Sequence, residues 1–497
     1  MRRSLPAATF VLVAACTVGP DYQRAPAPVP AAYKEEEGWK PATPQDTADR
    51  GAWWSIYDDP VLDGLERQID VSNQTLKAAE AAYRQAQAVV GEARAGFFPT
   101  ATLTGSGTRS GQGGGGSTVV TTTGPTATTT SGGRRGSSSV SNINLAGTAS
   151  WDIDLWGRIR RTVESDVASA QASAADIASA RLSAQSQLAT LYFELRSADD
   201  QQRLFSAAVD AFTQALKITQ NQYTVGVAAP TDVVTAQTQL EQTRSQLIAV
   251  GVTRAQFEHA IATLVGKPAA EFSLAPAPIA LSVPVAPPGV PSTLLERRPD
   301  IAASERLMAS ANAQIGVAVS GYYPDLTLSA SYGFASSGLS KLLRASNSFW
   351  SVGASLAETL FNGGFTAAQV AAAKASYDQT VATYRETVLT GFQQVEDELA
   401  ALRILAQQAE VEAYTVRLAR EAERLTLNQY QQGTVAYTAV ITAQTTRLNN
   451  EETALGIQQS RLVASVALVQ ALGGGWSAAD LPDDAQIKAE APSFFGP

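Results

Sequence analysis

Two stretches of this chain, residues 97–266 and 322–474, are divergent copies of one unit, and this duplication constrains the fold more than any other feature. The shared motifs are Phe97-Phe98-Pro99 and Tyr322-Tyr323-Pro324, Gln222-Tyr223-x-x-Gly226 and Gln429-Tyr430-x-x-Gly433, Thr231…Ala236-Gln237 and Thr438…Ala443-Gln444, and Leu264-Val265-Gly266 and Leu472-Gly473-Gly474. Each copy predicts a pair of strands followed by a long helical hairpin. Two such units cannot close a sheet by themselves, so the repeat indicates an oligomer.

Charge and hydropathy argue against two classes of protein. The net charge is −9 and no basic stripe occurs along the chain, which disfavours nucleic acid as a partner. Much of the apolar content is alanine. No run approaches the roughly 20 apolar residues of a membrane-spanning helix.

The N-terminus resembles a bacterial lipoprotein signal. A basic start, Met1-Arg2-Arg3, precedes a short apolar core and the small residues Val13-Ala14-Ala15 before Cys16, the only cysteine. The resemblance implies that residues 1–15 are removed and that Cys16 becomes the lipidated first residue, with palmitate among its acyl chains. Thr17 then favours sorting to the outer membrane. The alternative is a secretory signal with an incidental cysteine. A lipidated Cys16 leaves no thiol for a disulfide, a metal or catalysis.

The helical regions carry an apolar repeat of coiled-coil type, with spacings of four and three residues. In the first copy the seam consists of Val163, Val167, Ala170, Ala174, Ile177, Arg181, Ala184, Leu188, Leu191 and Leu195. The second copy gives Val370, Lys374, Tyr377, Val381, Tyr384, Val388, Gly391, Val395, Glu398 and Leu402. A second face of small residues follows Ala168, Ala172, Ala175 and Ala178. Two packed faces favour a ring of helices, although an ordinary antiparallel bundle uses the same pattern.

The length of the first helix is also informative. No proline occurs from Arg158 to Tyr223, so at 1.5 Å per residue the helix extends roughly 100 Å, enough to cross an aqueous compartment. Gly226 is predicted to stop this helix, and Pro230 suits the first turn of the next. Gln432-Gly433-Thr434-Val435 makes the corresponding turn of the second copy.

Strands are predicted at the opposite end of each unit. Apolar and polar residues alternate over residues 142–155, with Ile143, Leu145 and Trp151 on the apolar face. The same period recurs at 326–334 and 350–356, and Ala101 and Leu103 begin the remaining strand. Such strands fit a membrane barrel or the edge of a sandwich. Four strands alone are too few for a barrel, whose practical minimum is about eight, so a barrel requires several chains.

Two further segments are connections. The glycine-, serine- and threonine-rich stretch at 105–141 predicts a flexible loop at the cell surface, with the shorter loop at 335–348 as its partner. Gly111-x-Gly113-x-x-Gly116 within it matches a dinucleotide fingerprint in letters only, because no helix follows. Residues 267–292 contain seven prolines and are predicted to wrap around the outside of the helices.

These elements define the expected organisation of the chain. The signal peptide at 1–15 precedes a lipidated segment at 16–60. The first unit has a periplasmic helix at 61–99, a β-hairpin at 100–156 and a helical hairpin at 157–266. The proline-rich linker at 267–293 leads to the second helix at 294–323, the β-hairpin at 324–360 and the helical hairpin at 361–474. A tail at 475–497 ends the chain.

Three local motifs add a family resemblance: Cys16-Thr17-Val18-Gly19-Pro20-Asp21-Tyr22, Trp151-Asp152-Ile153-Asp154-Leu155-Trp156-Gly157-Arg158, and Arg297-Arg298-Pro299-Asp300-Ile301. With the duplication, they resemble the outer membrane factors, the TolC-like channels, and within them the lipoproteins similar to OprM and NodT. The resemblance implies a mixed α/β membrane fold. It implies a homotrimer with a 12-stranded outer-membrane β-barrel, four strands per chain, continued by a long α-helical barrel through the periplasm.

The resemblance also implies a function. The protein is expected in the outer membrane of a Gram-negative bacterium, passively conducting drugs or other toxic small molecules from an inner-membrane pump, of the resistance-nodulation-division type, and its periplasmic adaptor. The adaptor is expected to dock on the hairpin tips, which are Val225, Gly226 and Val227 in the first copy and Gly433, Thr434 and Val435 in the second. Protein secretion by a type I system and a lipidated coiled-coil tether without a pore are the alternatives.

One departure from the family concerns the periplasmic aperture. In the family, acidic residues near the second turn narrow this mouth and are held by salt bridges. The matching positions here are Ala439 and Thr442, and Val435 occupies a basic partner position, so the second turn lacks the residues of the family's charge lock. Asp232 remains at the corresponding site of the first turn. Converging helices are still expected to close the aperture sterically.

No catalytic, cofactor or metal site is predicted. His259, the only histidine, lies in a helical stretch and is interpreted as a solvated or packed residue. Carboxylates occur at helical spacing beside basic residues, as Glu451 and Glu452 do near Arg447, and solvated helix faces explain them. No group of residues has the spacing of metal ligands. The sequence predicts a channel rather than an enzyme.

Overall fold

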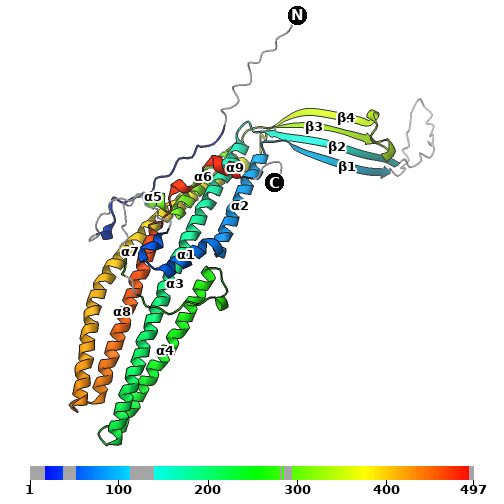
Figure 1. The fold of residues 1–497 in the computed structure, drawn as a ribbon. Coiled ribbons are helices and arrows are strands. Elements are labelled where there is room, and N and C mark those ends of the chain that lie inside the picture. Colours follow the sequence, from blue (N-terminus) through cyan, green and yellow to red (C-terminus); the bar gives the residue numbers. More distant parts are fainter. Residues whose placement is uncertain (1–16, 37–51, 112–138, 280–281, 285–293, 492–497) are drawn as a thin grey trace, which may run out of the picture.

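The structure is a computed structural model that describes residues 17–36, 52–111, 139–279, 282–284 and 294–491. The molecule is elongated, with a β-sheet at one end and two long helical hairpins that extend away from it (Figure 1). The signal peptide, Cys16 and the central part of the loop after the first strand lie outside the described residues. None of the described helices is long and apolar enough to cross a membrane.

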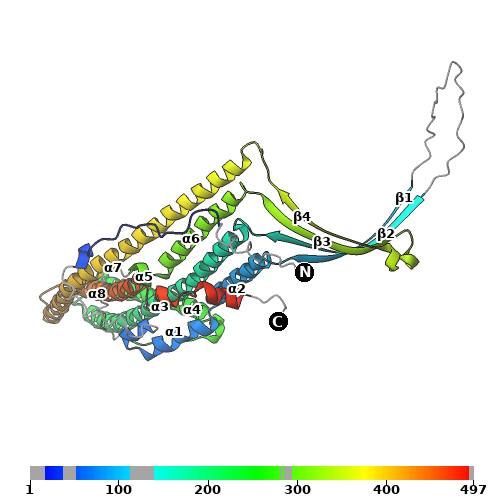
Figure 2. The ribbon, with the colours of Figure 1, turned by 90° about the horizontal axis from the view of Figure 1, so that it is seen from above.

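The sheet contains four antiparallel strands in the order β1-β2-β3-β4. The strands are β1 Thr100–Gly111, β2 Ser139–Ile153, β3 Asp325–Ser336 and β4 Ser348–Ala357. The sheet bends as it leaves the helices (Figure 2). Among the described strands, β1 and β4 each pair on one side only, so the sheet ends in two open edges.

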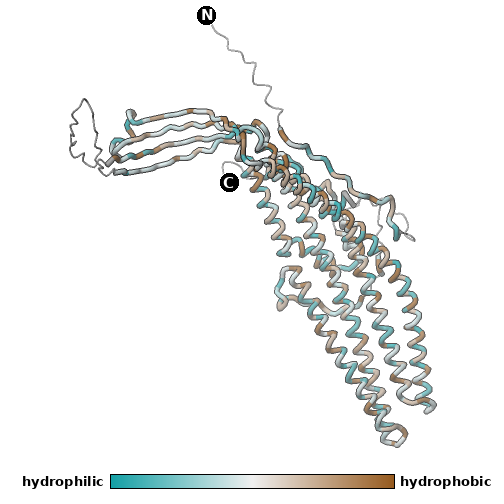
Figure 3. The backbone as a smooth tube through the Cα atoms, turned by 180° about the vertical axis from the view of Figure 1, so that it is seen from behind, coloured by the Kyte–Doolittle hydropathy of each residue, from teal (hydrophilic) through white to brown (hydrophobic). Residues whose placement is uncertain are grey.

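The two copies fold alike in their long helices, which are α3 Arg158–Thr224, α4 Pro230–Leu264, α7 Phe365–Gln431 and α8 Tyr437–Ala471. Both α3 and α7 have 67 residues, and both α4 and α8 have 35. Arg158 therefore corresponds to Phe365, an offset of 207. Neither of the 67-residue helices α3 and α7 contains proline, and polar and apolar residues intermix along the full length of each (Figure 3).

The shorter helices differ from the expected boundaries. The helix expected at 61–99 is two helices, α1 Pro60–Ser72 and α2 Gln74–Ala95. Asn73 ends the first and caps the second, since its side chain accepts a hydrogen bond from the backbone N–H of Leu76. The second expected helix is likewise split into α5 Leu294–Arg297 and α6 Pro299–Ser320, because Pro299 disfavours a helical Arg298.

The remaining elements are short. They are the 3₁₀-helices η1 Lys34–Glu36, η2 Trp53–Tyr57, η3 Ala269–Glu271, η5 Leu339–Lys341, η6 Ala345–Asn347 and η7 Ala478–Asp480, and the α-helix α9 Asp484–Glu490.

Two shorter helices, one beyond the other, pack along each of the 67-residue helices: α2 and α4 along α3, and α6 and α8 along α7. In the half near the sheet, α3 packs against α2 and α6, and α6 packs against α7. In the distal half, α3 packs against α4 and α8, and α8 packs against α7. The four distal helices thus lie side by side in the order α4-α3-α8-α7 (Figure 1).

Glycines lie where the C-terminal end of α4 meets α1 and where the C-terminal end of α8 meets α5. Gly266 follows α4 with φ +69°, and a Cβ there would lie 2.4 Å from the carbonyl oxygen of Ser72 at the end of α1. Gly473 follows α8 with φ +89°, and a Cβ would lie 2.1 Å from the carbonyl oxygen of Arg297. Positive φ and close approach both require glycine. The offset of the helices pairs Gly266 with Gly473, so the sequence alignment of Gly266 with Gly474 was wrong by one residue.

The predicted seams pack as expected. Along α3 every seam position is buried or half-buried except Arg181, which pairs with Asp70 at 2.8 Å. Along α7 the exposed exception is Lys374. The second alanine face packs as well, because Ala172 and Ala175 contact the alanines of α6. Two packed faces on α3 agree with a layer of helices rather than a closed four-helix bundle.

Candidate functional site

The sheet separates apolar from polar side chains. The pairing places Leu145 opposite Phe334, and Tyr332 opposite Trp350, on one face. Thr102 bonds Thr148 at 2.7 Å on the other face. The apolar face comprises Ala101, Leu103, Ile143, Leu145, Ala149, Trp151, Ile153, Leu326, Leu328, Ala330, Tyr332, Phe334, Trp350, Val352, Ala354 and Leu356. The alternation predicted from the sequence is therefore correct in β2, β3 and β4, and Ala101 and Leu103 of β1 lie on the same apolar face.

The apolar face is exposed in the single chain. Leu103, Trp350 and Val352 expose between 74 and 76 % of their surface. Trp151 lies at the end nearest the helices, where its indole N–H donates to the carbonyl oxygen of Phe97 at 2.9 Å. An indole with its polar atom satisfied and its ring on an apolar face is typical of a membrane interface.

The polar face holds small hydroxyl and amide side chains. Ser331 and Ser351 bond each other at 2.8 Å across β3 and β4, and Thr327 donates to Asp152 at 2.8 Å. Cross-strand polar pairs of this kind stabilise a face that contacts water. The sheet therefore has one face suited to lipid and one suited to an aqueous lumen.

The predicted hairpin tips form the distal end of the molecule. Val225 and Val227 expose 74 % and 75 % of their surface. Gly226 and Gly433 adopt φ +77° and +73°, as expected for glycines that stop helices. A Cβ at either glycine would meet nothing within 4 Å. Thr434 is exposed and Val435 half-exposed beside Gly433.

The predicted aperture residues lie just behind these tips. Asp232 is in the first turn of α4, where its carboxylate accepts a hydrogen bond from the backbone N–H of Ala229 at 3.3 Å. Ala439 is half-exposed, and Thr442 is exposed with its hydroxyl donating to the carbonyl of Thr438 at 2.9 Å. The structure thus gives Asp232 a helix-starting bond within its own chain.

An aromatic contact that sequence reasoning missed joins the two hairpins near their tips. The hydroxyl of Tyr430 in α7 donates to the side-chain oxygen of Gln222 in α3. The Tyr430 ring lies 5.3 Å from that of Tyr437, and both pack with Ala236 of α4. Gln222 and Tyr430 belong to the repeated Gln-Tyr motif, which was the available signal.

The N-terminal segment is attached to α3, α6 and α7. Asp21 pairs with Arg161 at 2.8 Å, and Tyr22 donates to Glu305. Further along, the backbone N–H groups of Lys34 and Glu35 donate to Glu396 at 2.7 and 2.9 Å. Sequence analysis did not identify these partners, because each lies more than a hundred residues away along the chain.

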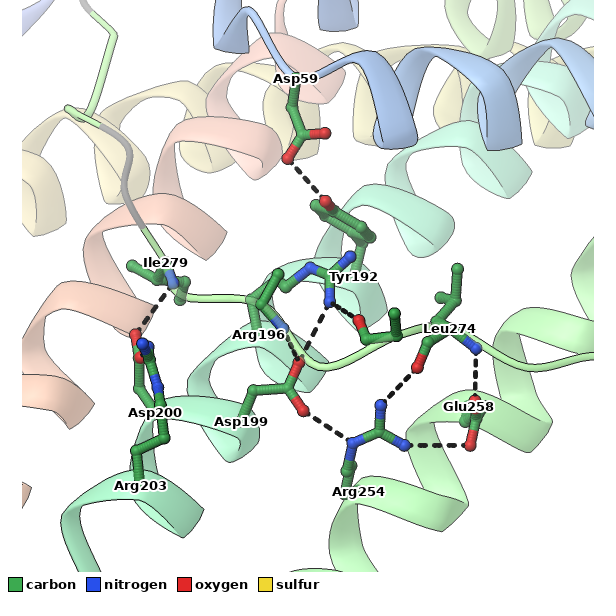
Figure 4. A network of polar contacts seen from close by, with 12 residues as sticks. Asp59, Tyr192, Arg196, Asp199, Asp200, Arg203, Arg254, Glu258, Leu274 and Ile279 are labelled. Carbon is green, nitrogen blue, oxygen red and sulfur yellow. Dashed lines mark hydrogen bonds and ion pairs between the residues drawn. The ribbon is translucent and has the colours of Figure 1, made fainter. Parts of the chain in front are cut away.

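A buried polar network attaches the proline-rich linker to the first hairpin (Figure 4). Asp199 of α3 accepts from Arg196 at 3.1 Å and from Arg254 of α4 at 2.7 Å. Arg254 also donates to the carbonyl of Leu274, and Arg196 to that of Ala275. The described part of the linker therefore contacts α3 and α4.

The network continues to Asp59, the residue that caps the N-terminus of α1. Tyr192 donates to Asp59 at 2.6 Å, and its ring lies under the Arg196 guanidinium at 4.8 Å. Burial, followed by the bond to Asp59, raises the pKa of Tyr192, so the phenol stays protonated. These contacts connect α1, α3 and the linker in the middle of the molecule.

One interpretation of the charged residues is wrong. Glu451 does not lie on a solvated face but is buried, and it bonds Arg420 of α7 at 2.6 Å and Arg447 of α8 at 2.7 Å. Arg447 also pairs with Glu423 of α7 at 2.5 Å. The interface between α7 and α8 covers the Glu451 carboxylate, although the Arg420 side chain stays largely exposed, and helical spacing by itself does not reveal this burial.

His259 is exposed on α4. Within the described ranges, no three His, Cys, Asp or Glu residues gather in a way that could hold a metal ion.

Comparison with known proteins gives the family. The family described as "Outer membrane efflux protein" matches residues 65–267 and 290–474. This chain belongs to the outer membrane efflux protein family. The match covers the two repeated units, their helices and all four strands.

Relatives within the family extend over nearly the whole chain. The pyoverdine export outer membrane protein OpmQ of Pseudomonas aeruginosa is 30% identical over 468 residues, which are 94% of this chain and 96% of that protein. The toluene efflux pump outer membrane protein TtgC of Pseudomonas putida is 27% identical over 491 residues, 98% of each chain.

Solved structures show the same fold. The outer-membrane channel OprN is similar with a TM-score of 0.80 and 27% identity, covering 93% of this chain and 100% of that one. The CmeC outer membrane channel of Campylobacter jejuni has a TM-score of 0.82 over 96% of this chain at 22% identity, which supports the fold alone.

This member of the outer membrane efflux protein family is accordingly an outer-membrane efflux channel protein of a Gram-negative bacterium. Its four strands are the contribution of one chain to a membrane β-barrel, and its long hairpins are the contribution to an α-helical barrel in the periplasm. Lipoproteins and trimers are typical of the family, whose members are channels rather than enzymes.

Proposed function

We propose that three copies of this chain form the outer-membrane channel of a tripartite efflux system. The observation that supports this most directly is the sheet, which has an apolar face, a polar face and two open edges. Three copies with four strands each close a 12-stranded barrel in which every edge is paired and the polar face lines water. A smaller number of strands leaves little room for a solute.

Transport through the channel is passive in this proposal. The distal tips accept a periplasmic adaptor, which connects them to an inner-membrane pump of the resistance-nodulation-division type that supplies the energy. Support comes from the names of relatives, which include a toluene efflux pump protein and a cation efflux system protein. These names span unlike solutes, so selection of the solute is assigned to the pump. The substrate class proposed is small toxic molecules.

The docking surface consists of Val225, Gly226 and Val227 on one tip and of Gly433, Thr434 and Val435 on the other. Exposed valines beside glycines without side chains give each tip an apolar surface that a partner can approach closely. The aperture lies behind them at Asp232, Ala439 and Thr442. Its closure is steric, because two of these three positions are uncharged.

The lipid anchor is Cys16, followed by the segment whose residues 18–36 attach to α3, α6 and α7. When Cys16 is anchored in the membrane, this attachment keeps the long helices directed away from the membrane, below the barrel.

Single-channel recording tests the proposal. Purified protein in planar bilayers is expected to form trimers with small, rare openings, because the tips converge. A variant shortened at both tips, without residues 222–232 and 429–439, is expected to conduct steadily. A trimer that folds and inserts but never conducts in the shortened form contradicts a channel and supports the non-conducting tether.

A second experiment separates small-molecule efflux from protein secretion. Single cysteines at Val227 and Val435 are used for crosslinking in cells, and the captured protein is identified. An adaptor that co-purifies with a drug pump supports efflux. An adaptor that belongs to a protein exporter contradicts it.

A further inference from the structure

Acidic and basic residues lie at opposite ends of the sheet. In the described strands and the β3–β4 connection, the acids Asp152 and Asp325 lie at the end joined to the helices. The cations Arg109, Lys341 and Arg344 lie at the opposite end. In the orientation of the proposed channel, this cationic end faces the outside of the cell.

Arg109 is placed on the lipid-facing side of its strand. It pairs with Ser141, and Leu103 of the same strand pairs with Gly147. Residues at even spacing share a face, so Arg109 shares the apolar face of Leu103 and Trp151. In the described strands it is the one charged residue on that face. A charge on the lipid face is costly near the middle of the bilayer and tolerated at its interfaces.

The height of Arg109 matches the outer interface. Ten residues of β2 separate Trp151 from Ser141, the partner of Arg109. At about 3.4 Å per residue and a tilt of about 45°, this segment rises roughly 25 Å, which equals the height of the apolar band of such barrels. With Trp151 at the inner interface, Arg109 reaches the level of the outer headgroups.

The β3–β4 connection combines cations with exposed leucines. Leu339 and Leu343 expose 73 % and 70 % of their surface, while Leu342 between them is buried and anchors the turn. Lys341 and Arg344 are exposed on the same short segment. Leucines beside exposed cations suit the boundary between acyl chains and anionic headgroups.

Barrel closure brings the two cationic groups together. β1 and β4 are the opposite edges of the sheet, so β4 of one copy meets β1 of the next. Arg109 of one copy and the β3–β4 connection of its neighbour then lie at the same seam. We propose that Arg109, Lys341 and Arg344 form a rim that binds phosphate-bearing anionic lipid of the outer leaflet. The inference rests on the proposed trimeric channel for its orientation and for the seam.

Titration of the purified full-length trimer in neutral detergent tests this rim. The probe is a bis-phosphorylated glucosamine-disaccharide lipid (lipid A), compared with the same lipid after removal of both phosphates. Binding is followed by the midpoint of thermal dissociation of the trimer. We expect phosphorylated lipid to raise the midpoint. The apparent affinity for this lipid should fall about fivefold for each charge removed, once in Arg109→Gln and twice in the double variant of Lys341→Gln with Arg344→Gln. Added salt should weaken binding.

The exposed Lys374→Gln removes one charge from the sheet-proximal part of α7, at the end of the sheet opposite to the rim, and should leave lipid affinity unchanged. The proposal is overturned if a variant that carries all three substitutions binds the lipid with the affinity of the wild type. It is also overturned if the wild type binds the dephosphorylated lipid as tightly as the phosphorylated lipid. A changed ion selectivity in bilayers without a change in lipid affinity also overturns it, because the cations would then face the lumen. A wild-type trimer that binds the lipid but never conducts contradicts the proposed channel and leaves the lipid rim standing.

Discussion

At the scale of single residues, the least compensated group is a carboxyl in the middle of the molecule. Glu66 of α1 is fully buried, and neither of its side-chain oxygens has a hydrogen-bond partner within the described structure. Burial, followed by repulsion from Asp70, raises the pKa of Glu66 from 4.5 to about 9. The folded chain therefore holds a proton at neutral pH that the unfolded chain releases.

Glu66→Gln is expected to stabilise the protein at high pH. The raised pKa means that the free energy of unfolding of the wild type decreases as pH rises from 4.5 to about 9. Glutamine does not ionise, so the variant should be more stable at pH 8 by on the order of 5 kcal/mol and nearly equal at pH 4.5. Thermal midpoints across this pH range measure the difference. The exposed Glu410→Gln should show no such trend, and parallel curves for wild type and Glu66→Gln would rule out the buried carboxyl as the cause.

Cys16→Ser addresses the lipid anchor. The substitution removes the thiol that accepts the acyl chains, so it should abolish incorporation of labelled palmitate. The barrel also holds the protein in the membrane, so export is expected to persist at a reduced level. Undiminished labelling of the variant would show that the cysteine is not the acylated residue.

At the scale of elements, helix termini carry the distinctive geometry. Gly266 and Gly473 are enclosed, since a Cβ would collide with the neighbouring backbone. Gly226 and Gly433 share their positive φ but stand in open space. The same backbone conformation therefore serves close packing in the middle of the molecule and leaves accessible surface at the tips.

Substitutions at Gly433 separate docking from helix termination. Asparagine tolerates the left-handed conformation, whereas a residue such as tryptophan incurs about 1–2 kcal/mol of backbone strain and adds bulk. Gly433→Trp should therefore cut efflux strongly while the trimer still assembles and inserts. Gly433→Asn should retain most efflux. If both variants misassemble, the glycine serves the fold alone, and normal efflux in Gly433→Trp and in its double mutant with Gly226→Trp would eliminate the docking role.

At the scale of the whole molecule, the pore is created by association. The hairpins of one chain are joined near their tips by Tyr430 and Gln222, and the packing of α3 against α8 joins them further up. The walls that complete the tunnel come from other copies in the proposed trimer. Each charged residue near the aperture therefore occurs three times around the pore, and its effect on ions depends on that assembly.

Asp232→Asn tests the electrostatics of the aperture. Three copies of Asp232 around a narrow pore attract cations, so we expect modest cation selectivity that falls in the variant and weakens with salt. Opening should change little. Asparagine can still accept a bond from the N–H of Ala229, which preserves the helix start. Reversal potentials in salt gradients give the measurement. Unchanged selectivity with slightly lower stability would assign Asp232 to the helix start alone, and a large rise in resting conductance would assign it to a lock.

Much of this architecture is local and was therefore predictable from the sequence. The long helices follow from proline-free heptads, their ends from Gly226, Pro230 and Gly433, and the two faces of the sheet from strict alternation. The repeat itself predicted that both copies fold alike. Each of these features depends on neighbours within a few residues, which periodicity records directly.

Tertiary contacts decided the rest. Asn73 divides the first short helix because its side chain also donates to the carbonyl of Leu264 at the end of α4. Glu451 is buried because α7 covers it, and the linker is held by Arg254 through carbonyl groups that any sequence would carry. Among the described residues none bonds the Glu66 carboxyl, which packing has buried in the interior. These outcomes depend on groups brought together from distant parts of the chain, and no local pattern encodes such distances.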